Sequence, residues 1–202
     1  MNTDFIILAA GKGTRMGGDS PKVLANLAGK PMLQHLIDTV NDLPKSKTSV
    51  IVGYKAKEVE DQISSSKKIN FVNQKKQLGT AHAVKQALPH IRKNSISVIL
   101  YGDAPLVTKA TLKRLINTAS KGNLSLLTFI KEDPTGYGRI VRASRSSIKK
   151  ITEHKDATAQ EREIKEVNSG IMAIRSDLLM KFLPMIKNNN AAKEYYLTDL
   201  VE

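Results

Sequence analysis

The stretch Phe5-Ile6-Ile7-Leu8-Ala9-Ala10-Gly11-Lys12-Gly13-Thr14-Arg15-Met16 decides how this chain folds. It begins with a continuous apolar run, which is typical of a short β-strand buried on both faces of a sheet. The run ends in a loop with two glycines, Gly11 and Gly13, where the backbone can turn tightly and bring its N–H groups close to a ligand. Successive N–H groups in such a turn form a concave anion site. The stretch therefore predicts a buried strand that leads into a candidate phosphate-binding loop.

Two cations accompany this loop. Arg15 offers a forked donor and Lys22 a point charge, and phosphate favours both kinds of group. The glycine spacing fits neither the dinucleotide-binding fingerprint nor the P-loop, because Arg15-Met16 follows Gly13 and no Gly-Lys-Ser/Thr stands at the required distance. An ordinary glycine-rich connection with two solvated cations explains the same residues. On this stretch alone, both interpretations stay open.

The composition sets the class of protein. The chain has 202 residues, of which 41% are hydrophobic, and we expect residues 1–202 to form a single domain with a sizeable core. The chain has no cysteine, which excludes disulfides and thiolate metal sites. No apolar run approaches the roughly 20 residues of a membrane span, and the N-terminus lacks the pattern of a signal peptide. We therefore expect a cytoplasmic protein with no membrane partner.

The formal net charge of +13 is large for this length. Lysine and arginine are scattered, and the densest stretch, residues 142–150, has no interleaved aromatic side chains on which bases could stack. We expect a solvated basic surface, whose field would attract phosphorylated substrates, and no nucleic-acid partner. A nucleic-acid binder remains the alternative, and it predicts steeply salt-dependent retention.

Apolar runs and helical patterns alternate along the first 120 residues. This alternation predicts an α/β fold with a doubly wound, mostly parallel (Rossmann-like) sheet in a three-layer αβα arrangement. Thr80 and Ser176 are candidate caps for the helices that follow them. After the opening strand, the expected strands cover 49–53, 69–72, 96–101, 124–130, 139–141, 148–151 and 169–174, and the expected helices cover 32–40, 57–63, 81–88, 112–119, 176–185 and 194–201.

Ligands of such sheets sit beyond the carboxyl ends of the strands. The Gly11 loop and Gly102-Asp103 both follow strands at that edge, so we expect them to converge. Asp103 is a candidate ligand for Mg²⁺, since this ion binds one or two carboxylates and takes its remaining ligands from water and substrate phosphates. A turn aspartate before Pro105 is the competing interpretation.

Other polar residues also stand near expected strand ends. Gln74 and Gln77 could offer amide groups to a base edge, and Gly79 allows close backbone approach. An ordinary loop-to-helix junction explains these residues equally well. Glu153 and Asn168 suit sugar hydroxyls, but either could be a surface residue. The four histidines have no metal-ligand spacing, and a structural role is expected for His82.

Taken together, several motifs resemble one family, and the resemblance spans nearly the whole chain. The family is the uridylyltransferase domain of the bacterial bifunctional N-acetylglucosamine-1-phosphate uridyltransferase/glucosamine-1-phosphate acetyltransferases. The matching motifs are Leu8 to Met16, Pro21-Lys22-Val23-Leu24, Gln77-Leu78-Gly79-Thr80-Ala81-His82-Ala83, Tyr101-Gly102-Asp103, Gly136-Tyr137-Gly138-Arg139-Ile140, Glu153-His154-Lys155-Asp156-Ala157, Asn168-Ser169-Gly170-Ile171 and Glu194-Tyr195-Tyr196-Leu197-Thr198-Asp199.

The resemblance implies a fold of the nucleotide-diphospho-sugar transferase type and Mg²⁺-dependent transfer of UMP from UTP to N-acetylglucosamine 1-phosphate. It implies catalytic roles for Arg15, Lys22 and Asp103, with Asp103 as the metal ligand. The implied nucleotide-binding residues are Leu8, Ala9, Ala10, Gly11, Gly13, Lys22, Gln74, Gln77, Gly79, Thr80, Tyr101 and Gly102, and the implied sugar-binding residues are Gly138, Glu153, Asn168 and Thr198.

The chain also departs from the family pattern. In the family, the domain continues past the segment that matches Glu194 to Asp199, and this continuation supplies an asparagine as a second metal ligand. Hexapeptide repeats then follow, which form the trimer and carry the acetyltransferase activity. We therefore expect a C-terminally truncated domain that is a monomer or weak oligomer and has no acetyltransferase activity. A related thymidylyl- or cytidylyltransferase and a catalytically impaired nucleotide-sugar binder are the alternatives.

Overall fold

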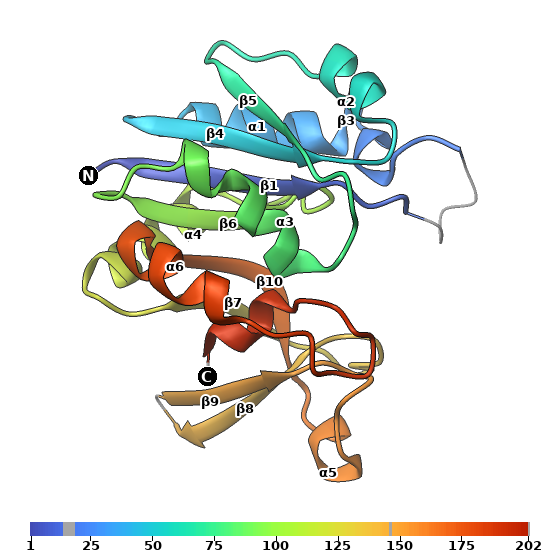
Figure 1. Ribbon diagram of the computed structural model, residues 1–202, viewed down its shortest axis with the longest axis vertical. Helices are drawn as coiled ribbons and strands as arrows, with labels where there is room; N and C mark the ends of the chain where they lie inside the picture. Colours follow the sequence, from blue (N-terminus) through green and yellow to red (C-terminus); the bar gives the residue numbers. More distant parts are fainter. Residues whose placement is uncertain (14–18, 146, 202) are drawn as a thin grey trace.

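The computed structural model describes residues 1–13, 19–145 and 147–201. An eight-stranded sheet forms its middle layer, in the order β5-β4-β1-β6-β10-β8-β9, and β7 also pairs with β10 (Figure 1). A separate two-stranded ladder joins β2 (Asn26–Leu27) to β3 (Lys30–Pro31). The prediction of an α/β fold with helices on both faces of one sheet is confirmed.

Strand β1 (Thr3–Ala9) lies inside the sheet and explains the layering. Successive side chains of a strand point to opposite faces, so a continuous apolar run can supply two cores at once. Phe5 and Ile7 belong to the core that includes residues of α1 and α4, whereas Ile6 and Leu8 belong to the core that includes residues of α3 and α6. Because both faces of β1 are buried, the opening stretch is apolar without interruption.

The first half of the chain forms the parallel part of the sheet. β1 pairs in parallel with β4 (Ser46–Val52) and with β6 (Ile96–Tyr101), and β4 pairs in parallel with β5 (Ile69–Asn73). The connecting helices are α1 (Met32–Asn41), α2 (Ala56–Gln62), α3 (Thr80–Ala87) and α4 (Lys109–Ser120). Leu8 of β1 stands opposite Tyr101 of β6, so the loops that follow these two strands leave the sheet side by side.

The second half adds antiparallel strands. β10 (Glu166–Arg175) pairs with β6 and also with β7 (Ser125–Ile130), and its register with β7 shifts between Asn168 and Met172. β8 (Arg139–Ser144) and β9 (Ser147–Thr152) form the hairpin at the lower end of Figure 1. The helices of this half are α5 (Ala159–Arg162) and α6 (Ser176–Phe182).

Three local predictions are wrong. The segment expected as a helix over 194–201 is helical only as a 3₁₀ turn, η5 (Leu197–Val201), because Tyr195 bonds to the backbone on either side of the start of α3 instead. Thr80 does not cap α3: Gly79 holds the cap position, and the Thr80 hydroxyl accepts from Leu197 N at 2.9 Å. Ser176 does not cap α6 either, because its Oγ bonds to the hydroxyls of two buried serines, both at 2.7 Å.

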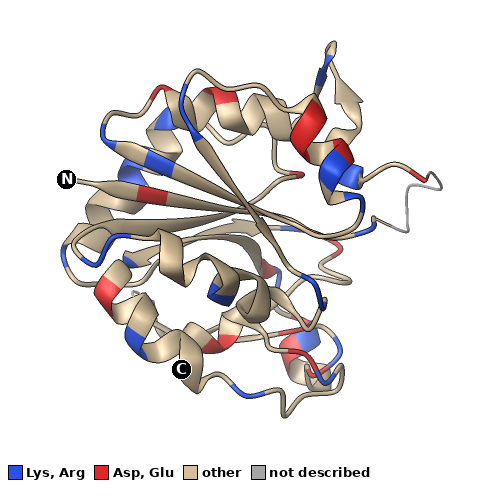
Figure 2. Cartoon of the chain, turned by 45° about the horizontal axis from the view of Figure 1, so that its top comes forward, with Lys and Arg blue, Asp and Glu red and all other residues tan. Residues whose placement is uncertain are grey.

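The remaining short elements are 3₁₀ turns: η2 (Lys22–Leu24), η3 (Leu88–His90) and η4 (Leu183–Met185). Blue and red segments are interspersed over the elements of Figure 2, as expected for a solvated charged surface. Within the described ranges, every helix is too short or too polar to reach across a bilayer.

Candidate active site

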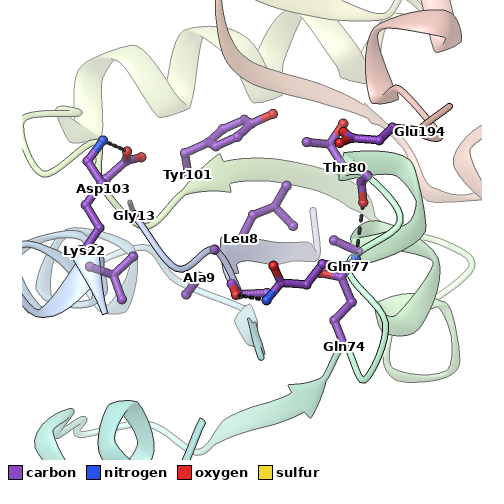
Figure 3. Close-up of a pocket in the computed structure, with 15 residues that line it drawn as sticks. Leu8, Ala9, Gly13, Lys22, Gln74, Gln77, Thr80, Tyr101, Asp103 and Glu194 are labelled. Carbon is purple, nitrogen blue, oxygen red and sulfur yellow. Dashed lines mark hydrogen bonds and ion pairs between the residues drawn. The ribbon is translucent and has the colours of Figure 1, made fainter. Parts of the chain in front are cut away.

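A cavity of about 370 Å³ opens at the carboxyl ends of β1 and β6. The glycine loop after β1 and Asp103 after β6 both line it, so the predicted convergence of these two segments is confirmed (Figure 3). We call this cavity the main pocket. Its lining residues are Leu8, Ala9, Ala10, Gly11, Gly13, Lys22, Val23, Gln74, Gln77, Gly79, Thr80, Ala83, Tyr101, Asp103 and Glu194.

Gly13, in the described first part of the loop after β1, lies closely against Lys22 of η2. Gly13 has φ +67°, and a Cβ added there would stand 2.4 Å from Lys22 Cβ, so this position requires glycine. Val23 and Leu24 are buried in the core beneath α1. Their burial anchors η2 and so fixes the position of the Lys22 backbone. The sequence thus places one lysine at the rim of the pocket by burying the two residues after it.

Lys22 and Asp103 meet across the main pocket. Lys22 Nζ lies 2.6 Å from Asp103 Oδ2, although 81 residues separate them in the chain. The two side chains are 41% and 31% exposed, so water screens the pair and its contribution to folding stability is small. Asp103 Oδ1 has no hydrogen bond with a described residue. Lys22 and Asp103 therefore form a partly exposed ion pair in the wall of the main pocket.

Two glutamine amides stand at the other end of the main pocket, and backbone oxygens fix their orientation (Figure 3). Gln77 Nε2 donates to Ala10 O at 2.7 Å, and Gln74 Nε2 donates to Gly79 O at 3.2 Å. Because each amide nitrogen serves the protein, each amide oxygen is left as an acceptor without a described protein partner. These groups suit a base edge that carries N–H donors.

Tyr101 lies between the two ends of the pocket in Figure 3. Burial raises the pKa of its phenol well above the usual value, and the nearby Glu153 charge raises it further. Tyr101 therefore stays neutral throughout the physiological range. It forms a wall of the main pocket and lies close enough to Glu153 to respond to its charge.

The four predicted sugar-binding residues form a second group, the Glu153 cluster, composed of Gly138, Glu153, Asn168 and Thr198. Thr198 Oγ1 donates to Glu153 Oε1 at 3.2 Å. Asn168 N donates to Gly138 O at 2.9 Å, and a Cβ added to Gly138 would stand 3.4 Å from Glu153 Oε1. Gly138 immediately precedes β8 and Glu153 immediately follows β9, whereas Asn168 lies in β10 and Thr198 in η5.

One extended segment connects the Glu153 cluster to the main pocket. Tyr195 N donates to Leu78 O at 2.9 Å, and Ala81 N donates to Tyr195 O at 2.9 Å. Residues 194–198, which we call the crossing segment, therefore run along the loop that starts α3. At its ends, Glu194 lines the main pocket and Thr198 belongs to the Glu153 cluster.

Most of the predicted nucleotide-binding residues line the main pocket. Gly102 does not: its N–H donates to Leu8 O at 2.9 Å, and it packs behind the wall against Val23. Arg15 lies outside the described residues. Sequence reasoning missed three lining residues, Val23, Ala83 and Glu194. All three belong to the motifs quoted for the family resemblance, and that was the signal available for them.

Asp103 is the candidate magnesium ligand in the main pocket. No group of three or more histidine or acidic side chains able to hold a metal occurs in the described parts of the chain. Mg²⁺ does not need such a group, since it commonly binds one or two carboxylates and completes its shell with water and substrate phosphates. Asp103, with one oxygen free of described protein partners and the other bonded only to a lysine, fits that mode.

Burial raises the pKa of Glu153 above its ordinary value of 4.5, and the neighbouring Asp156, Asp199 and Glu194 charges act in the same direction. A raised carboxyl pKa in the folded protein means that folding stability declines as pH rises from 4.5 through the folded pKa. We therefore expect Glu153→Gln to unfold at a higher temperature than the parent at pH 7, with the difference vanishing at pH 4.

Thermal unfolding followed by circular dichroism at both pH values measures this effect. Glu163→Gln, at an exposed position, is the matched control and should leave the unfolding temperature unchanged at each pH. If Glu153→Gln were no more stable than the parent at pH 7, burial of the Glu153 carboxylate would not cost folding stability, and its pKa would not be raised.

Comparison with known proteins identifies the family. Residues 5–169 match the model of the MobA-like NTP transferase domain. The chain is 48% identical over 198 residues to the bifunctional protein GlmU of Cellvibrio japonicus and 50% identical over 200 residues to that of Ruthia magnifica, covering 98% and 99% of this chain. Each alignment covers 44% of the relative, so the chain spans less than half the length of these curated relatives.

Solved structures confirm the fold. A crystal structure of UDP-glucose pyrophosphorylase complexed with UDP-glucose superposes with a TM-score of 0.79 at 17% identity, covering all of this chain and 86% of the other. HddC from Yersinia pseudotuberculosis, complexed with GMP-PN, gives 0.69 at 23% identity, covering 96% and 83%. The glycine loop, the sheet that carries it and the family match over four-fifths of the sequence lead to one conclusion: this chain belongs to the family of MobA-like NTP transferase domains.

Proposed function

We propose that this chain transfers UMP from UTP to N-acetylglucosamine 1-phosphate, giving UDP-N-acetylglucosamine and pyrophosphate. The observation that carries the proposal is the main pocket, in which the glycine loop, Lys22 and Asp103 stand at one end and two oriented amides at the other. The high identity to bifunctional GlmU proteins over nearly the whole chain supports these two substrates over other members of the family.

The acceptor phosphate is already an anion at neutral pH, so no general base is needed. One of its oxygens attacks the α-phosphorus of UTP, the new P–O bond forms, and the bond to the β-phosphate oxygen breaks in line with it. Rate acceleration comes from positioning and from neutralising the charge that the departing pyrophosphate carries. We assign this neutralisation to Lys22 and to Arg15.

Lys22 must change partner for this role. In the structure its ammonium group neutralises Asp103, and we propose that it turns to the phosphate oxygens when the triphosphate enters. Asp103, together with those phosphates, would then hold Mg²⁺, which supplies further charge neutralisation and orients the phosphate oxygens. The Glu153 cluster would bind the sugar, because its carboxylate, hydroxyl and amide groups are suitable partners for sugar hydroxyls and an N-acetyl group.

A pyrophosphate-release assay on the 202-residue chain tests the proposal. We expect Mg²⁺-dependent turnover with UTP and N-acetylglucosamine 1-phosphate, and at least tenfold less with CTP or dTTP. Turnover with CTP or dTTP alone would identify a cytidylyl- or thymidylyltransferase instead. Calorimetric binding of UDP-N-acetylglucosamine without any turnover would identify a non-catalytic nucleotide-sugar binder.

We further propose that the reaction takes place in the cytoplasm, where both substrates are soluble, and that the 202-residue chain acts as a monomer or weak oligomer. Neither nucleic acid nor a membrane is needed for it. Light scattering after gel filtration measures the oligomeric state, and a stable trimer would contradict this part of the proposal.

A further inference from the structure

His82 takes no part in the chemistry proposed above, yet it touches a residue that does. It lies in the first turn of α3 and lines a second cavity of about 490 Å³, separate from the main pocket. We call this second space the rear cavity. From there, His82 Nδ1 lies 3.0 Å from Gln74 Nε2. Gln74 is 4% exposed and lines the main pocket, so the imidazole reaches the pocket only through this amide.

The hydrogen-bond pattern determines which atom of Gln74 faces which partner. The Gly79 carbonyl can only accept, so the group 3.2 Å from it must be the amide nitrogen of Gln74. That nitrogen carries a second hydrogen, and its second partner is His82 Nδ1. Nδ1 must therefore be unprotonated. Both amide hydrogens are then used, and Gln74 Oε1 is left without a described protein partner.

We propose that His82 is a positioning residue for base recognition: its unprotonated Nδ1 holds the Gln74 amide so that Oε1 is offered to an N–H donor of the base. This inference rests on the proposed function for the identity of the ligand, a uridine nucleotide. Uracil has an N–H at N3, whereas cytosine has a lone pair there. An amide locked with its oxygen toward the ligand therefore favours uracil over cytosine.

The charge state of His82 determines whether its Nδ1 can accept a hydrogen bond from the Gln74 amide. A protonated imidazole would carry hydrogens on both nitrogens, and Nδ1–H facing the Gln74 nitrogen would break the bond or rotate the amide. Burial lowers the pKa of His82, and the nearby Lys85 charge lowers it further. The other titratable residues lining the rear cavity are Lys187 and Tyr195. The Gln86 amide nitrogen lies 3.4 Å from His82 Nε2 and donates to His82 O at 3.1 Å. His82 is thus kept neutral at pH 7, and its hydrogen bond with the Gln74 amide is lost only as pH falls.

Direct binding of UDP and CDP by calorimetry tests the inference without requiring turnover. We expect His82→Leu to reduce the UDP:CDP affinity ratio about tenfold, the factor that corresponds to the loss of about 1.4 kcal/mol. His82→Asn can place its amide oxygen near the site of Nδ1, so it should retain the ratio within about twofold. A purely structural role predicts a lower unfolding temperature and equal losses for the two nucleotides, with no change in the ratio.

The pH dependence of the same ratio in the parent needs no substitution, so it tests the inference even if a variant fails to fold. Phosphate titration is shared by both ligands and cancels. We expect the ratio to fall as pH is lowered through the His82 pKa, and Lys85→Met to move this transition to higher pH because it removes a repelling charge. A ratio that is the same for parent, His82→Leu and His82→Asn, or that is independent of pH, would overturn the inference.

These outcomes separate the two proposals. If the ratio behaves as expected but no pyrophosphate is released, the catalytic proposal fails and the role of His82 stands. If UDP and CDP bind equally to the parent, the positioning role is wrong whether or not the chain turns over. If the parent binds neither nucleotide, both proposals fall together.

Discussion

Asp103→Asn should lower Mg²⁺-dependent pyrophosphate release by at least about a thousandfold, which corresponds to about 4 kcal/mol of lost transition-state stabilisation. The substitution keeps the size and shape of the side chain and removes only its charge. Asp103 is the carboxylate that faces Lys22 across the main pocket, and one of its oxygens has no described protein partner. An amide is a poor ligand for Mg²⁺, so the ion would be lost together with its charge neutralisation.

The fold should survive this substitution. Asp103 and Lys22 are both about one-third exposed or more, and ion pairs of this kind contribute at most about 1 kcal/mol to stability. The unfolding temperature should therefore change little while activity is lost. Asp61→Asn, which breaks an exposed ion pair with Lys57 on α2, is the matched control and should retain full activity. Comparable turnover by the two variants would exclude Asp103 as the metal ligand.

Gly79→Ala should destabilise the protein by about 3 kcal/mol and weaken nucleotide binding as well. Gly79 has φ +112° and ψ 175°, a conformation that is essentially restricted to glycine. A Cβ there would also stand 2.6 Å from Tyr195 O and 2.7 Å from Tyr195 N, so the crossing segment would have to move away. Because Gly79 O accepts from the Gln74 amide, the end of the main pocket that holds the two glutamine amides would be disturbed too.

Urea unfolding of Gly79→Ala measures the stability effect, and Gly122→Ala is its matched control. Gly122 also has a positive φ, +91°, but a Cβ added there would meet nothing within 4 Å. The control should therefore show only the conformational cost of a positive φ, about 1–2 kcal/mol, and no loss of nucleotide affinity. Equal losses in the two variants would show that contact with Tyr195 contributes nothing.

The parallel half of the fold could be predicted from the sequence because its strands are apolar on both faces. Runs such as 96–101 have a strong signal that does not depend on partners. The 194–201 segment was predicted wrongly because its backbone bonds to Leu78 and Ala81, more than a hundred residues away, and no local pattern records such a partner. The two cap predictions failed for the same reason: both hydroxyls bond to distant parts of the chain.

Part of the candidate site could be predicted from the sequence, and part could not. The meeting of the Gly11 loop with Asp103 followed from sheet topology, since both segments leave neighbouring strands at the same edge. Within the Glu153 cluster, Glu153 and Asn168 stood out in the sequence only as candidates, and Gly138 and Thr198 were named through the family resemblance alone. No local pattern brings the four together, because they lie in or beside four separate elements. The bond between His82 and Gln74 could not be foreseen, since it depends on how a helix start is placed against the end of β5.

The crossing segment has a consequence for how the two substrates influence one another. Leu197 N donates to the Thr80 hydroxyl in the wall of the main pocket, and the next residue, Thr198, donates to Glu153. A single peptide unit thus separates the contact to the wall of the main pocket from the contact to the Glu153 cluster. On the proposed function, a shift of this backbone caused by one substrate would move the groups that bind the other, so the two binding sites would be coupled through η5.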